Sequence, residues 1–249
     1  MTTTNALRTT ILAGMALLAA CASRGPALTQ MPPDSLLALG LRELADEDWG
    51  DAAEALQQFT IQYPSHPRYQ EARLRLADAF LGDGEYISAA ADYVRLAADY
   101  PGGEYADDAR FGVCVAYAEL SPAPQLDQQY TQAALDHCEA LVLTFPDSEF
   151  TPRAREIAQE MRDKLAEKMF RIGDYYFKSH FYDPAVQYFA ETLEAYPGAA
   201  VVPKVLLRLY EAYTELGYAE EAQGARERLL RDFPSSDEAA RIRSVDGDA

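Results

Sequence analysis

Proline directly after an aromatic residue interrupts this 249-residue chain at five helix-forming stretches. Successive prolines of these pairs are 37, 45, 51 and 37 residues apart, and an alanine lies twelve residues before each of them. Proline ends a helix because it has no N–H to donate and its ring clashes with the preceding turn. Helix stops that recur in one register therefore predict a repeat of helical units. The five pairs are Tyr63-Pro64, Tyr100-Pro101, Phe145-Pro146, Tyr196-Pro197 and Phe233-Pro234.

The sequence before each stop has the pattern of two packed helices. Apolar, small and aromatic residues follow one another at helical steps, as at Leu76, Ala77 and Phe80. Gly84 and Gly217 each lie seventeen residues before their proline, where a turn between two helices is required. The unit resembles the tetratricopeptide repeat. We therefore predict an all-α fold, an α-solenoid of five tetratricopeptide-like helix pairs, with another type of helix-pair solenoid as the alternative.

Two units are longer than the others. The third has eight extra residues, which match the segment SPAPQLDQ at 121–128 and predict a loop between its two helices. The fourth has fourteen extra residues, and its segment 155–177 contains no proline and one glycine. This predicts an extended first helix in the fourth unit, which would stiffen the junction between units three and four.

The N-terminus has the pattern of an export signal. Arg8 precedes an apolar stretch of about twelve residues, too short to span a bilayer but typical of a secretory signal. The stretch ends in Leu-Ala-Ala-Cys, which resembles the lipobox of bacterial lipoproteins and predicts lipidation of Cys21. An ordinary signal peptide that contains a cysteine is the alternative.

The predicted division of the chain follows from the signal and the repeats. We predict a signal peptide at 1–20, a lipidated tether at 21–33, repeats one to three at 34–146, repeats four and five at 147–242, and a disordered tail at 243–249.

The charge of the chain is strongly acidic, with 40 acidic and 22 basic side chains. Nucleic acid and anionic lipid are both contacted through clustered lysine and arginine, so this balance argues against either as an electrostatic partner.

The two other cysteines, Cys114 and Cys138, lie on apolar helix faces. We interpret them as separate buried residues, although an exported protein can form disulfides and the sequence leaves their pairing open.

Helix positions next to those of the predicted core indicate a groove along the first helices of the solenoid. In the first three units these positions are mostly apolar, which is typical of a binding surface for an extended apolar or aromatic peptide. A covering segment such as the tether is the alternative explanation. The predicted groove residues are Leu37, Leu41, Leu44, Leu74, Asp78, Leu81, Phe111 and Val115.

Motifs for catalysis are missing from the sequence. The three histidines are far apart, and none belongs to an HxxxH or HExxH pair; there is also no CxxC, Walker loop, GxSxG or SxxK. We therefore predict a protein that is not an enzyme and that uses no metal and no cofactor.

The second half of the chain resembles the BamD family, the tetratricopeptide lipoproteins of the outer-membrane β-barrel assembly machinery. The likeness rests on FPDSEF before the long helix, Lys-Leu-Ala at 164–166, Gly-x-Tyr-Tyr at 173–176 and LLRLYEAYTELGYAEEA at 206–222. It implies a lipid-anchored protein on the periplasmic face of the outer membrane.

As partners, this resemblance implies unfolded β-barrel precursors, the POTRA domains of the barrel-forming subunit and other assembly lipoproteins. Gln187 and Tyr188 replace the arginine typical of the family, so docking residues would have to lie elsewhere. The alternative function is a periplasmic scaffold for cell division, a Tol–Pal system or pilus assembly. Candidate docking residues are Arg162, Lys164, Lys168 and Arg171.

Overall fold

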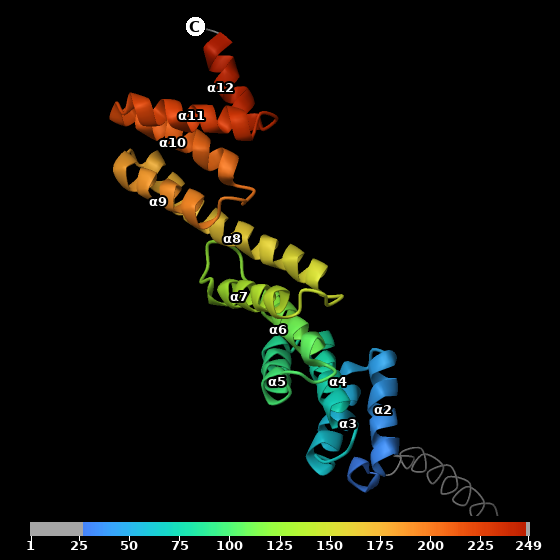
Figure 1. The fold of residues 1–249 in the computed structure, drawn as a ribbon. Helices are drawn as coiled ribbons and strands as arrows, with labels where there is room; N and C mark the ends of the chain where they lie inside the picture. The colour runs from blue at the N-terminus through green and yellow to red at the C-terminus, as the bar shows by residue number, and fades with distance from the viewer. Residues whose placement is uncertain (1–26, 248–249) are drawn as a thin grey trace, which may run out of the picture. The chain divides into compact units, whose positions relative to one another are not determined.

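The computed structural model describes residues 27–247, and within that range the chain consists of helices and turns, with no strand. The predicted signal peptide and Cys21 lie outside the described residues. The helices in chain order are η1 (Leu28–Gln30), α2 (Pro33–Ala45), α3 (Trp49–Gln62), α4 (Tyr69–Gly82), α5 (Tyr86–Asp99), α6 (Ala106–Leu120), α7 (Gln129–Thr144), α8 (Thr151–Lys178), α9 (Tyr182–Ala195), α10 (Val202–Leu216), α11 (Ala219–Asp232) and α12 (Asp237–Gly247) (Figure 1).

The predicted all-α fold of tetratricopeptide type is confirmed. Helices α2 to α11 follow one another as consecutive pairs, and the second helix of each pair ends just before one of the aromatic–proline pairs. The alanine twelve residues before each proline is buried in all five units, where it faces neighbouring helices. These alanines are Ala52, Ala89, Ala134, Ala185 and Ala222.

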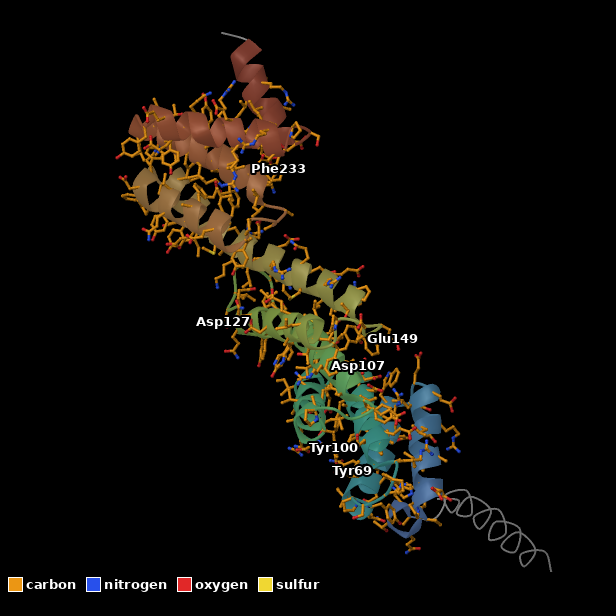
Figure 2. The ribbon with its side chains drawn as sticks, viewed as in Figure 1. Tyr69, Tyr100, Asp107, Asp127, Glu149 and Phe233 are labelled. Atoms are coloured by element: carbon orange, nitrogen blue, oxygen red, sulfur yellow. A yellow bond between two sulfur atoms is a disulfide. The ribbon has the colours of Figure 1, made fainter. Side chains whose placement is uncertain are left out.

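The five helix stops share one backbone geometry. Each aromatic residue has φ between −125° and −134° and ψ between 51° and 65°, outside the helical region, and its N–H still donates to the carbonyl four residues earlier. Proline disfavours the helical conformation of the residue before it, which accounts for this geometry. All five rings are half-buried, and Figure 2 labels two of them, Tyr100 and Phe233.

The chain divides into two compact units, Met1–Ala79 and Phe80–Ala249. The sequence predicted a division at Pro146, but α7 and α8 on either side of that proline share a core and belong to the same compact unit. In the first unit α2 packs against α3, and a Cβ added at Gly40 would lie 2.6 Å from Cγ of Leu56. The hydroxyl of Tyr63 donates to the carbonyl of Met31 at 2.8 Å and holds the end of the predicted tether on this unit.

In the second compact unit the helices from α5 to α11 each pack against the next along the chain. α12 packs against α10 and α11, and its Ala239 and Ile242 are buried in the same core as Leu206. The prediction of a disordered tail at 243–249 is therefore wrong as far as Gly247, because α12 continues to that residue.

Four residues with positive φ mark the turns inside the helix pairs. Gly84 and Gly217 adopt φ of 77° and 76°, as their place in the pattern predicted. Glu47 and His180 adopt φ of 62° and 61° at the equivalent position, seventeen residues before their prolines. In these two units a residue with a Cβ occupies the left-handed conformation that glycine adopts without strain.

Replacing Glu47 by glycine is expected to raise the free energy of unfolding by about 0.5–1 kcal/mol, because relief of the left-handed strain outweighs the greater freedom of glycine in the unfolded chain. Chemical denaturation followed by circular dichroism measures the change. Glu47→Ala is the matched control, because it removes the same carboxylate and keeps the strain. Equal stability of the two variants would show that backbone strain at residue 47 is negligible.

α8 is a single helix of 28 residues that contains the predicted helix at 155–177, and two different cores lie along it. Its first half packs into a core with α6 and α7, through buried residues that include Ile157 and Met161. Its second half packs into a core with α9 and α10, where the backbone at Gly173 lies against the ring of Phe189. Arg208 of α10 also donates to Asp174 at 2.8 Å. α8 is therefore shared by two neighbouring cores.

Cys114 of α6 and Cys138 of α7 form a disulfide. Both residues are fully buried, as predicted, but the interpretation of them as two separate thiols was wrong. Adjacent antiparallel helices bring their Cα atoms to 4.9 Å, within the range that a disulfide spans.

Candidate functional site

The docking residues predicted on α8 lie on two sides of the helix. Each residue turns an α-helix by about 100°, so Arg162 and Lys164 lie about 160° apart around its axis. Arg162 points to α7, where it forms an ion pair with Glu139. Lys164 and Lys168 instead reach the loop 121–128 between α6 and α7, and Arg171 lies near Lys168. The predicted set therefore separates into three residues that share a surface and one that does not.

Lys164 and Lys168 fasten the loop 121–128 to α8. The ammonium group of Lys164 donates to the hydroxyl of Ser121 at 2.8 Å, and that of Lys168 donates to the carbonyl of Leu126 at 2.8 Å. Gln128 is buried at the end of the loop and donates to the carbonyl of Ala123 at 2.9 Å. The predicted loop is confirmed in position, and it is an ordered part of the surface; Figure 2 labels its residue Asp127.

The loop and α8 together form a hollow that we call the basic–aromatic pocket, with a volume of about 340 Å³. Arg171 donates to Glu167 at 2.7 Å and remains more than half exposed. Tyr175 is 68% exposed, and the ring of Tyr176 stacks on that of Tyr188 with centroids 5.6 Å apart. Exposed tyrosine and arginine are typical of residues that anchor protein partners. The pocket is lined by Pro124, Gln125, Lys168, Arg171, Ile172, Tyr175 and Tyr176.

Sequence reasoning missed the aromatic half of this pocket. Tyr175 lies four residues after Arg171 and seven after Lys168, so helical spacing alone places the three on one side of α8. The contribution of Pro124 and Gln125 had no comparable signal, because it depends on how the loop folds back onto a helix more than forty residues later in the chain.

Two residues of the predicted peptide groove do not line a surface. Leu37 and Leu74 are 0% and 1% exposed, so their assignment to the groove is corrected: both belong to the core. A helix in a solenoid packs against neighbours on more than one side, and positions one step from the first core stripe are then buried as well. Leu41 and Leu44 are partly exposed.

The other predicted groove residues are partly buried. In the first compact unit, Asp78 accepts a hydrogen bond from Arg75 at 2.7 Å. In the second compact unit, the ring of Phe111 stacks on that of Phe150 with centroids 4.8 Å apart, and Val115 packs beside the core of α7 and α8. Leu81 keeps part of its surface exposed. Binding of a peptide at these positions stays a prediction.

None of the helices in residues 27–247 combines the length and apolar character needed to cross a membrane. Over the same range, histidine, cysteine, aspartate and glutamate do not gather in threes that could bind a metal ion.

Residues 29–229 match the protein family YfiO, described as outer membrane lipoprotein. The match covers most of the chain, from before α2 to residue 229 near the end of α11. The chain belongs to the YfiO family. It is similar to the outer membrane protein assembly factor BamD of Caulobacter vibrioides, with 28% identity over 221 residues that cover 87% of this chain and 72% of that protein.

Other relatives carry the same name. BamD of Vibrio cholerae is 21% identical over 228 residues, which cover 88% of this chain and 95% of that protein. Among solved structures, the chain is similar to the TPR2AB domain of yeast Sti1, with 15% identity, a TM-score of 0.47 and coverage of 83% of this chain and 80% of that one. The chain is thus a member of the BamD family of outer-membrane protein assembly factors, as the sequence resemblance implied.

Proposed function

We propose that this YfiO-family chain is a non-enzymatic scaffold that binds unfolded β-barrel precursors and the POTRA domains of a barrel-forming subunit. Lipid on Cys21 anchors it to the outer membrane, and its helices extend into the periplasm. Membership of a family of outer membrane lipoproteins and similarity to proteins named outer membrane protein assembly factor BamD support the role in assembly. The observation that carries the docking of a partner is the basic–aromatic pocket on α8, in a chain of net charge −18.

The chemistry of this pocket fits an acidic partner surface with an apolar or aromatic side chain. Lys168 and Arg171 provide positive charge, while Ile172, Tyr175 and Tyr176 provide apolar contact area. The bonds from Lys164 and Lys168 to the loop hold the pocket in shape before a partner binds, which lowers the entropic cost of association. Precursors would contact the partly exposed groove positions Leu41 and Leu44 of α2.

Affinity purification of the full-length lipoprotein from membranes tests the proposal, and we expect a POTRA-containing barrel protein to be recovered with it. Arg171→Glu together with Tyr175→Ala should reduce that recovery by about tenfold, because both residues are of the types that dominate binding energy. Lys168 is left in place so that the loop keeps its anchor.

The matched control combines Arg153→Glu with Ile87→Ala, since both residues are exposed and neither lines the pocket. It should leave recovery unchanged. Recovery of cell-division or pilus proteins in place of a barrel protein would overturn the assembly role, and equal recovery with both variants would overturn the position of the docking site.

A further inference from the structure

A second hollow lies between α7 and α8, and we call it the arginine–leucine groove. It has a volume of about 520 Å³ and is separate from the basic–aromatic pocket. Leu143 projects from α7 on one side of the groove and is 85% exposed, and Val142 lies beside it. Arg155 and Arg162 lie on the other side, both from α8. The groove thus has a wall from α7, which is apolar apart from Glu139, and a basic wall from α8.

The basic wall has charge to offer a partner. Throughout residues 27–247 no carboxylate lies within ion-pair distance of Arg155, which is exposed. Arg162 pairs with Glu139, and both side chains of that pair remain in contact with solvent. Exposed pairs of this kind contribute little to stability and can exchange partners. The groove therefore has one positive charge more than negative, within a chain of net charge −18.

The spacing of the two arginines indicates the shape of a suitable partner. They lie seven residues apart on one helix, which is two turns, and this separates them by about 10.5 Å along one face. A partner helix lying along the groove presents side chains at the same interval. Gln159, between the arginines, donates to Asp163 at 3.1 Å and to the carbonyl of Gly198 at 3.3 Å, so the floor of the groove is held in place.

Packing of this chain does not account for these side chains. Leu143 and Arg155 are both exposed, so neither fills the core shared by α7 and α8. An exposed large apolar side chain opposite an unpaired arginine is instead the arrangement that receives an amphipathic, acidic segment.

We propose that the arginine–leucine groove binds an amphipathic helix of another protein, with two carboxylates seven residues apart and a leucine-sized side chain between them. Arg155 lies about 160° around α8 from Arg171 of the basic–aromatic pocket. The two surfaces therefore face in nearly opposite directions, and a partner in the groove leaves the pocket accessible. α8 is then a junction that holds two partners at once.

Fluorescence anisotropy with two labelled helical peptides tests this proposal on the purified full chain in detergent. One peptide carries two glutamates seven residues apart with leucine between them on the same face, and the other has lysine in place of both glutamates. We expect the glutamate peptide to bind about tenfold more tightly than the lysine peptide, with an affinity that falls as salt is added. Equal binding of the two peptides, or no binding of either at millimolar concentration, would overturn the proposal.

Substitutions locate the binding and separate it from the proposed docking pocket. Arg155→Glu should weaken the glutamate peptide and strengthen the lysine peptide, and Leu143→Asp should weaken the glutamate peptide, as expected for direct contact. Arg153→Glu makes the same charge change on another face of α8 and should have no effect, and Arg171→Glu should likewise leave peptide binding unchanged. Binding that follows Arg171 instead of Arg155 contradicts the assignment. A chain that sediments as a dimer and becomes monomeric with Leu143→Asp would show that the groove binds a second copy, which also overturns the proposal.

Discussion

Replacing Cys114 and Cys138 together by alanine is expected to lower the free energy of unfolding by about 3 kcal/mol. The two residues are 24 apart in the sequence, and the disulfide between them limits the conformations of the unfolded chain across the whole loop 121–128. Both positions are fully buried, and alanine has no polar side-chain atom that would be left unpaired there. Urea unfolding of the double variant and of the native chain, both without reductant, measures the loss.

Reduction of the unchanged chain is the matched comparison for this double variant. Dithiothreitol should destabilise the native sequence by a similar amount and should leave the alanine variant unaffected. A variant that unfolds at the same urea concentration as the native chain would show that the cross-link contributes nothing. Mass spectrometry after alkylation, without reduction, should find the two cysteines in linked peptides.

Truncating Phe189 to alanine is expected to cost about 4 kcal/mol of unfolding free energy. Its side chain is 0% exposed, its ring lies 5.9 Å from that of Phe170, and the backbone at Gly173 closes the other side. A cavity at this point separates α9 from the second half of α8. Hydrogen exchange should therefore speed up in α9 and in residues 166–178, beyond any change in α7.

Phe181 provides the matched control for this truncation, because the same phenylalanine-to-alanine change removes a ring that is 60% exposed. Its expected cost is below about 0.5 kcal/mol. Similar losses from the two variants would contradict the assignment of Phe189 as the centre of the packing between α8 and α9.

The repeat could be predicted from sequence because its signals are local. The helix stop at Phe145-Pro146, the burial of Ala134 and the loop after Leu120 follow from residue types and spacing alone. The turn position seventeen residues before each proline was found where it is glycine. It was missed at Glu47 and His180, because the neighbouring helices impose the left-handed conformation there on residues that do not favour it.

The features that could not be predicted depend on contacts between distant segments. Pairing of Cys114 with Cys138 requires the relative register of α6 and α7, which spacing within either helix does not determine. The interactions of Lys164 and Lys168 are with residues 43 and 42 positions earlier in the chain. By contrast, the separation of Arg162 from the other cations could have been found from the sequence, because it follows from the helical angle alone.

The length of α8 also restricts how this fold can change. The fourteen additional residues of its unit turn the helix through about 3.9 turns, close to a whole number. Ile157 therefore faces the core of α7 while Gly173 still faces α9, as an unextended helix of the repeat would present it. Insertion or deletion of two residues between them would rotate one core away from its partner by about 200°. Changes in the length of this helix are thus compatible with the fold only near whole numbers of turns, in steps of about 3.6 residues, and a relative with a different spacer should differ by such a step.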